Sequence, residues 1–458
     1  MRKAVTVMLT GLALLGPTLA GSVVPTGDAA YARDGGFELT GKRLPTVDID
    51  SDDELEDVRS QLDGLRTVDP GRYLSTLPGA PDQSRLAAIA KESASSLWVT
   101  LTTRVPTSQD YSDEIALAVG TDSGVECAST EVSLSNDDAL YAGPVSIGVL
   151  VDPSTMSDSD DAAECMGAER LYVQVAHDPD DGNELPVEIS VLEEPSVVAT
   201  EKLPDEADSE DFEPSWPQQG RTSPTTGARS FADAPALAPG RYSDSVRTGD
   251  ARLYRVDTGW GQHAQATVNL SPLSAGEAAQ MGEAGLDVNM AILGPHRQPV
   301  AGDAEEASAE SDVLLGARTP TVRYRNRESS DAGVGASALA GPYYVLVTAT
   351  GSFRAPDLEV SYDLDLRVAG DEGGSPQYAG PAAPPNGALI TDGASRTTER
   401  SAPDRAKAAD SERQAERSAG WWPIFGPVAA GSLAAGIVLS VGAFLRRRRL
   451  RSATPPTG

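Results

Sequence analysis

Short runs of alternating apolar and polar residues fill the middle of the chain, from about residue 70 to about residue 370. Three such runs, Arg241–Val246, Ala251–Val256 and Ala264–Leu270, are separated by turns at 248–250 and 259–262. Alternation with a period of two places one face of each strand in a core and the other in solvent. The pattern therefore predicts an all-β protein made of antiparallel β-sandwiches.

The alternating pattern occurs twice. Asp69-Pro70-Gly71-Arg72-Tyr73 recurs as Ala238-Pro239-Gly240-Arg241-Tyr242, and the first-copy runs Ser84–Ile89 and Leu97–Thr102 correspond to the second and third runs of the later copy. Each copy closes on two further runs, at 169–175 and 185–192 in the first and at 342–347 and 358–368 in the second. Internal self-similarity indicates a repeated structural unit. We predict two tandem antiparallel β-sandwiches, over 68–196 and 231–370.

Three other segments lack this pattern. Residues 33–67 form an N-terminal lead segment, in which Leu55, Leu62 and Leu65 favour a short amphipathic helix. Residues 197–230 are rich in Pro, Asp, Glu, Ser and Thr, which predicts an acidic linker or a long irregular loop. Residues 371–420 combine Pro, Gly, Ala and charge, and we expect a disordered stalk there.

The first 32 residues are typical of a secretory signal peptide. Arg2 and Lys3 precede the apolar stretch Val5–Leu19, and Ala30-Tyr31-Ala32 supplies the small residues that a signal peptidase reads. We predict cleavage after Ala32. Glycine and proline interrupt the apolar stretch, which therefore falls short of the roughly 20 residues of a membrane-spanning helix.

The C-terminal region predicts a single transmembrane helix over residues 421–445. No charged residue occurs there, and Trp421 and Trp422 stand where an interfacial aromatic belt would lie. Four arginines follow directly and set the topology by the positive-inside rule: Arg446, Arg447, Arg448 and Arg449. We expect a single-pass protein of the cell membrane, with an extracellular N-terminal bulk and a basic cytoplasmic tail over 446–458.

Charge narrows the possible partners. Acidic residues number 68 against 37 basic ones, which gives a formal net charge of −31. A nucleic-acid binder needs a basic face to neutralise phosphates, so nucleic acid is excluded as a partner. Arginine greatly outnumbers lysine, and together with the tail anchor this bias indicates an actinobacterial envelope protein.

The two cysteines allow one bridge. Outside the cell, Cys127 and Cys165 can form a disulfide across a loop of about 38 residues, worth roughly 3–4 kcal/mol by loop-closure entropy. Two separate buried thiols are the alternative.

The second copy resembles the bacterial pre-peptidase C-terminal (PPC) domain family. The resemblance rests on five segments: Gly240–Val246, Gly249-Asp250, Arg252–Val256, Gly261-Gln262 and Gly341–Val345. The first copy departs from the pattern, with Ser75 where the family has Asp and Ala87 where it has the strand Tyr. The tandem copies, stalk and anchor also resemble the extracellular part of actinobacterial membrane-anchored envelope proteins. The resemblance implies jelly-roll-like sandwiches with accessory or binding roles and no catalysis.

The sequence offers few candidates for chemistry. His177, His263 and His296 are the three histidines, and none belongs to a Gly-x-Ser-x-Gly or His-Glu-x-x-His motif. We interpret them as surface turn residues and predict that the protein is not an enzyme. A secreted hydrolase, or an accessory subunit of an extracellular enzyme, is the alternative.

Acidic loops offer weak calcium candidates. The best has four oxygen-bearing side chains, Asp178, Asp180, Asp181 and Asn183, and the others lie at 48–54 and 158–164. Calcium takes six to eight oxygen ligands from flexible loops, but none of the three loops has the spaced pattern of an EF-hand. Solvated, mutually repelling turns are the alternative reading, and calcium-dependent adhesion is the function that a metal site would favour. No other cofactor is predicted.

Three tryptophans bear on binding. Trp98 and Trp260 fall within or beside predicted strands, which favours the core over a ligand platform, while Trp216 lies in the predicted linker and could pack against a sandwich. Together these features predict a non-catalytic cell-surface protein that binds or scaffolds an extracellular protein or an envelope polymer.

Overall fold

The computed structural model describes residues 29–31, 37–50, 61–80, 83–104, 113–134, 143–156, 159–177, 184–209, 212–215, 220–281, 285–351 and 358–379. Strands dominate these residues. Short α-helices accompany them: α3 (Ser159–Gly167), α4 (Ala275–Met281) and α5 (Ala332–Gly335), and residues 61–63 of the lead segment are also helical. The prediction of an all-β fold is confirmed.

The first sandwich consists of two antiparallel sheets. One has the order β5 (Gly71–Leu77), β12 (Leu185–Glu194), β7 (Ser96–Thr103), β10 (Val145–Val151). The other has the order β6 (Gln83–Ala90), β11 (Arg170–His177), β8 (Asp113–Gly120), β9 (Glu126–Leu134). Eight strands shared between two sheets in this order form a jelly roll.

The second sandwich repeats the topology strand for strand. Its first sheet has the order β15 (Gly240–Arg247), β22 (Glu359–Ala369), β17 (His263–Leu270), β20 (Val313–Arg318). Its second sheet has the order β16 (Ala251–Thr258), β21 (Gly341–Gly351), β18 (Leu286–Leu293), β19 (Pro299–Glu306). The internal repeat read from the sequence is thereby confirmed. The two closing runs of each copy form corresponding strands, β11 and β12 in the first sandwich and β21 and β22 in the second.

The repeated unit extends further upstream than the alternating pattern indicated. β2 (Leu39–Arg43) runs parallel to β5, with Lys42 opposite Tyr73. β14 (Ser223–Pro224) runs parallel to β15, with Ser223 opposite Tyr242. The lead segment and the expected linker therefore each add a strand beside the first tyrosine of a sandwich.

The upstream segments also make corresponding backbone contacts with the second strand of each sandwich, β6 and β16. β3 (Val47–Asp50) pairs antiparallel with β6, so that Val47 faces Leu86, and Ala228 faces the equivalent Leu253. β4 (Thr67–Val68) runs parallel to β6 beside Ala88, as Ala236 does beside Arg255. These contacts are made by backbone groups, which amino-acid composition does not reveal. A further strand, β1 (Ala29–Tyr31), pairs with β2 and lies within the predicted signal peptide.

The repeated Gly-Arg-Tyr motif has the same local role in both copies. The Tyr242 hydroxyl donates a hydrogen bond of 2.8 Å to the carbonyl of Ala238, four residues earlier, and the Tyr73 hydroxyl donates to the carbonyl of Asp69. Each tyrosine thus closes the Pro-Gly turn that starts the first strand of its sandwich. Burial raises the pKa of Tyr73 to about 12, so its hydroxyl remains a donor at neutral pH.

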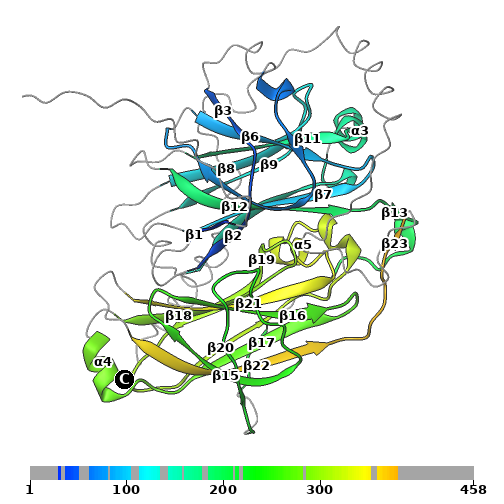
Figure 1. Ribbon diagram of the computed structural model, residues 1–458. Coiled ribbons are helices and arrows are strands. Elements are labelled where there is room, and N and C mark those ends of the chain that lie inside the picture. The colour runs from blue at the N-terminus through cyan, green and yellow to red at the C-terminus, as the bar shows by residue number, and fades with distance from the viewer. Residues whose placement is uncertain are drawn as a thin grey trace, which may run out of the picture.

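The four sheets stack as four layers (Figure 1), with β7 and its neighbours facing β21 and β18 across the middle. Every residue of β7 is buried, whereas a strand with one face in water would alternate. Trp98 on β7 and Trp260 in the second sandwich are each 4% exposed, which confirms that both belong to packed interiors.

The predicted disulfide is confirmed. Cys127 on β9 and Cys165 on α3 are joined by an S–S bond of 2.04 Å, and both side chains are buried. The bridge fixes the helix against an edge strand of the first sandwich.

Several predictions concern residues outside the described part of the chain. They include the body of the signal peptide, Trp216, the calcium candidates Asp178, Asp180, Asp181 and Asn183, the stalk beyond Ala379, the helix over 421–445 and Arg446, Arg447, Arg448 and Arg449. Among the residues that the structure does describe, no helix is long and apolar enough to cross a membrane.

Candidate functional site at the interface between the two sandwiches

A turn of the second sandwich is inserted into the outer face of the first. It spans residues 294–298, between β18 and β19. The carbonyl of His296 accepts a hydrogen bond of 2.6 Å from Thr100 Oγ1, and Gln298 Nε2 donates one of 2.8 Å to the carbonyl of Gly148. A Cβ atom on Gly148 would lie 2.9 Å from both Gln298 Nε2 and Thr100 Oγ1. Only glycine therefore admits the turn at this point of β10.

An ion cluster of three buried side chains joins the sandwiches. Arg327 of the second sandwich lies between Asp152 and Glu194 of the first, with Nη1 3.1 Å from Asp152 Oδ2 and Nη2 2.8 Å from Glu194 Oε2. The side chains are 0%, 4% and 2% exposed, respectively. The contact to Glu194 is an ion pair without hydrogen-bond alignment, whereas the contact to Asp152 is also a hydrogen bond.

Neighbouring groups complete the surroundings of this ion cluster. The Arg327 guanidinium stacks on the ring of Tyr324, 3.6 Å from its centroid, and lies 5.6 Å from that of Trp98. Ser96 Oγ donates a hydrogen bond of 2.5 Å to Asp152. Burial opposes ionisation of Asp152, but Arg327 and the serine donors outweigh it and hold the pKa of this carboxyl below its usual range. The carboxylate therefore remains charged in the interface.

A second buried ion pair lies further along the same interface. Arg297 contacts Glu188 through Nη1, and the two side chains are 4% and 0% exposed. The other Glu188 oxygen accepts a hydrogen bond of 2.8 Å from the backbone nitrogen of Thr40, at the start of β2. Arg297 has a φ of +69°, a conformation that costs a non-glycine residue about 1 kcal/mol or more. The fold holds this strained backbone where the guanidinium reaches both Glu188 and the ring of Phe231, 4.5 Å away.

Apolar contacts surround the ion pairs. Phe37 and Phe231 meet edge to face at 5.4 Å, and Phe231 meets Tyr344 in the same way at 4.9 Å. Together they form part of one buried cluster that draws on the lead segment and both sandwiches: Phe37, Leu39, Leu74, Phe231, Ala234, Ala251, Leu253, Leu293, Tyr344 and Leu346. A smaller cluster places Ala338 and Leu339 on Trp98. Ion pairs enclosed by apolar side chains are shielded from water and salt.

The expectation that the histidines lie on the surface is wrong for His177 and His296, which are 3% and 1% exposed. His296 stacks on Trp98 at 4.6 Å between ring centroids, and its Nε2 bonds Gln298 Oε1 at 2.8 Å. Its Nδ1 has no partner among the described residues. Burial, with a smaller contribution from Arg327, lowers the pKa of His296 to about 4. The sequence predicted a turn correctly, but the second sandwich buries that turn against the first.

We expect His296 to make the protein less stable in mild acid. The unfolded chain binds a proton on this residue near pH 6.5, whereas the folded protein does so only near pH 4, so stability falls as pH decreases through that interval. Between about pH 7.5 and about pH 5 the loss from this residue is about 2 kcal/mol. Urea unfolding of the wild type and of His296→Gln at both pH values measures it. Equal pH dependence in the two proteins would contradict the assignment.

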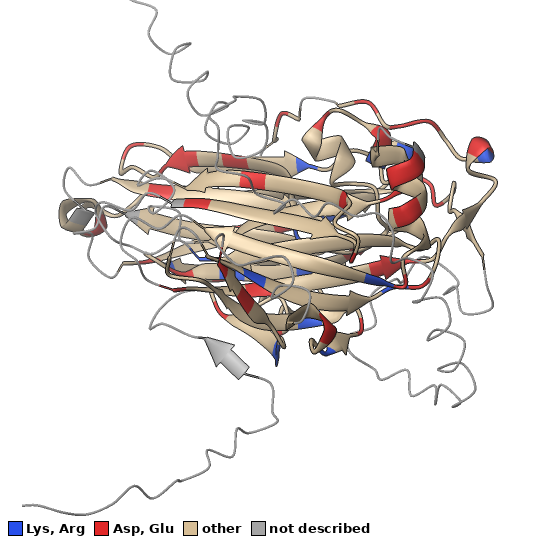
Figure 2. Cartoon of the chain, turned by 90° about the horizontal axis from the view of Figure 1, so that it is seen from above, with Lys and Arg blue, Asp and Glu red and all other residues tan. Residues whose placement is uncertain are grey.

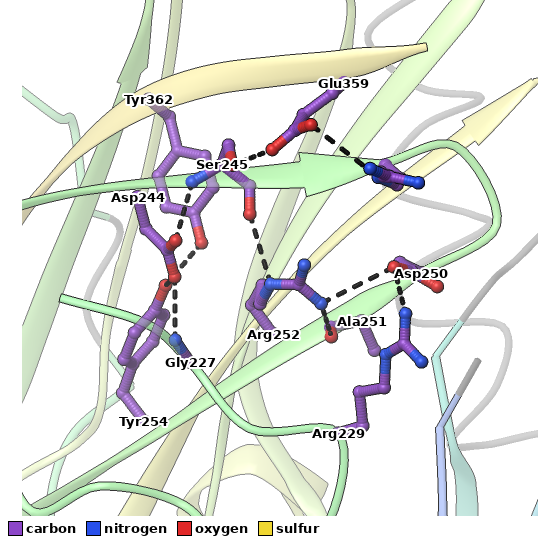
Figure 3. Close-up of polar contacts among 11 residues, drawn as sticks. Gly227, Arg229, Asp244, Ser245, Asp250, Ala251, Arg252, Tyr254, Glu359 and Tyr362 are labelled. Atoms are coloured by element: carbon purple, nitrogen blue, oxygen red, sulfur yellow. Dashed lines mark hydrogen bonds and ion pairs between the residues drawn. The ribbon is translucent and has the colours of Figure 1, made fainter. Parts of the chain in front are cut away.

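The family-like motif of the second sandwich forms a polar network (Figure 3). Tyr254 donates a hydrogen bond of 2.5 Å to Asp244 Oδ2, which also accepts one of 2.7 Å from the Gly227 backbone nitrogen, and the Tyr362 hydroxyl lies 2.5 Å from that of Tyr254. Burial raises the pKa of both phenols, which remain protonated donors. The network joins three strands to the upstream segment.

The first sandwich has no counterpart of the Asp244, Tyr254 and Tyr362 side chains at the equivalent positions. Ser75 stands opposite Val187, as Asp244 stands opposite Tyr362, and Ala87 replaces Tyr254. A lone carboxylate or phenol left in this place would be an unsatisfied buried polar group, so loss of the whole set avoids that cost. The two sandwiches thus differ jointly in the side chains at this one site.

The arginine of the motif keeps its contact in both copies. Arg252 donates a hydrogen bond of 3.1 Å to the carbonyl of Ser245, and Arg85 donates one of 2.8 Å to the equivalent carbonyl of Thr76. Arg252 also lies 3.6 Å from Asp250, which pairs with Arg229 at 2.7 Å (Figure 3). These contacts bind the first two strands of each sandwich together.

The described acidic residues outside the interface have structural partners or face solvent. Asp48 pairs with Arg85, and Glu164 accepts a hydrogen bond of 2.8 Å from Thr121. Acidic positions are spread over many strands and loops, with few basic ones among them (Figure 2). In the ranges that the structure describes, no three His, Cys, Asp or Glu side chains come together as metal ligands.

No family model matches the sequence, and no curated protein does. Among solved structures, the chain is similar to that of infectious bursal disease virus, Gx strain, at 11% identity over 73% of this chain and 72% of that one, with a TM-score of 0.21. The tandem CBM22-1-CBM22-2 domain of Paenibacillus barcinonensis Xyn10C gives 7% identity over 73% and 99%, with a TM-score of 0.17. Likeness at this level carries no information about function.

Proposed function

We propose that the protein is a non-catalytic scaffold of the cell surface, in which two PPC-like sandwiches act as one rigid extracellular body on a single C-terminal membrane helix. Its partner would be an extracellular protein or an envelope polymer. The proposed anchor and signal peptide rest on the sequence patterns at the two ends of the chain.

The buried ion cluster is the observation that supports this proposal most directly. Domains that move independently meet through polar, hydrated surfaces. Here charged groups from both sandwiches are fully enclosed, and separating the sandwiches would leave Arg327 without its partners. Asp152, Glu194 and Arg327 are used in this contact, and such use suits a body that holds a fixed shape better than one that performs acid–base chemistry.

Labelling of cysteine variants tests the topology. Because the only two cysteines form the disulfide, single additions give a clean readout. A membrane-impermeant maleimide should label Glu310→Cys on intact cells, but Ser452→Cys, in the predicted tail, only after permeabilisation. A chain ending before Trp421 should appear in the medium. Protection of Glu310→Cys on intact cells would refute the proposed orientation.

Cross-linking tests the scaffold role. A photoreactive residue at an exposed position such as Glu310 should give discrete cross-linked species from the anchored chain on intact cells. The released chain is the control for contacts that depend on the membrane. If no species forms from exposed positions on either sandwich, the binding role is contradicted.

A further inference from the structure

The chain does not leave the molecule where the second sandwich ends. After β22, residues 371–379, here called the strap, return to the interface and form β23 (Gln377–Tyr378), which pairs with β13 (Val197–Val198), just beyond the first sandwich. The Ala379 nitrogen donates a hydrogen bond of 2.7 Å to the Ser196 carbonyl. Figure 1 shows the two short strands side by side at the level of the interface.

The strap is in contact along its length. Gly373 donates a hydrogen bond of 2.9 Å to the carbonyl of Trp260. Gly374 has a φ of +69°, and a Cβ atom there would lie 2.8 Å from Pro204. Glycine is therefore required where the strap turns past the segment that follows the first sandwich. Val197, the partner of Tyr378, packs against the core of the second sandwich.

Tyr378 brings the strap into the ion cluster. Its hydroxyl donates a hydrogen bond of 2.9 Å to Glu194 Oε1, while Glu194 Oε2 faces Arg327. Burial, followed by the charge of Glu194, raises the pKa of Tyr378, so the phenol remains a donor. Among the residues that the structure describes, the strap thus supplies the donor for this buried carboxylate oxygen.

From these contacts we infer that the strap is a latch that holds the two sandwiches together at the root of the stalk. It supplies a hydrogen-bond donor to Glu194, a member of the ion cluster, from beyond the second sandwich. A cut or a displacement before Tyr378 would loosen the interface, whereas a cut after Ala379 would leave it closed. The position of stalk cleavage would thus decide whether the body stays rigid.

Protease sites inserted into the full chain test this directly. One variant has the site after Glu372 and its matched control has it after Gly380. Hydrogen exchange of peptides that cover Trp98, Glu194 and Arg327 is measured before and after cutting. We expect the cut after Glu372 to speed exchange about tenfold, the size that follows from losing a hydrogen bond to a charged group, and the cut after Gly380 to have no effect. Equal exchange after the two cuts would overturn the latch.

Substitutions give an independent readout. Tyr378→Ala should speed exchange at the same peptides, while Gln377→Ala, its exposed neighbour in the same strand, should not. Peptides from β11 and β21 report whether the cores of the first and second sandwich, respectively, remain folded. Slow exchange at the ion cluster in Tyr378→Ala would overturn the inference. None of these outcomes depends on the membrane anchor or on a partner, so they stand apart from the proposed function.

Discussion

Replacement of Arg327 by methionine is expected to lower the free energy of unfolding by about 3–5 kcal/mol. The side chain fits the space, but Asp152 and Glu194 would then be buried without a cation. The loss of stability is large because the free-energy cost of burying the two carboxylates is no longer offset by the guanidinium. Urea unfolding at neutral pH measures the change, and we expect the two sandwiches to unfold in separate transitions.

Arg325 offers the matched control for this variant. It lies two residues away, pairs with Asp205 and Glu328, and is exposed to solvent. Arg325→Met should leave the unfolding curve unchanged, because exposed ion pairs contribute little. The triple variant Asp152→Asn, Arg327→Met, Glu194→Gln should recover part of the lost stability by removing the stranded charges. A single unshifted transition in Arg327→Met would show that the ion cluster does not hold the sandwiches together.

Removal of the disulfide is expected to destabilise the first sandwich by about 3–4 kcal/mol. The bridge closes a loop with a sequence separation of 38 residues, and its loss returns that conformational freedom to the unfolded chain. The double variant Cys127→Ala, Cys165→Ala avoids leaving a single reactive thiol. Its unfolding should be compared with that of the wild type with and without a reductant.

The reductant distinguishes the effect of breaking the disulfide bond from the effect of replacing the cysteine side chains. Wild type under reducing conditions should approach the stability of the double variant, while the variant should not respond. A loss below about 1 kcal/mol would contradict the expected loop-closure contribution of the bridge.

The two sandwiches share one topology but place their buried polar and charged side chains differently. The second copy retains the Asp244–Tyr254–Tyr362 network, whereas the first has small or apolar residues in its place. In the first copy, Asp152, Glu188 and Glu194 instead form ion pairs with arginines of the second sandwich. The two copies have thus kept one topology and diverged in where they place their buried charges.

Local patterns in the sequence determined the strands, the repeat and the bridge. Alternation with a period of two depends on near neighbours. So does the Gly-Arg-Tyr motif, whose tyrosine contacts a carbonyl four residues earlier. The bridge follows by elimination, because the chain has only two cysteines. None requires knowledge of how distant segments meet.

Only the tertiary structure decided what the charged and aromatic residues do. Arg327 and Asp152 are 175 residues apart, and nothing in the periodicity of either segment indicates the other. His296 and the segment over 197–230 carry polar sequences typical of exposed turns and linkers, yet one is buried and the other is paired with strands. Burial of a polar group depends on finding a partner, and here the partners come from the other sandwich. The sequence by itself therefore determines two β-sandwiches, and the contacts between them determine that they form one body.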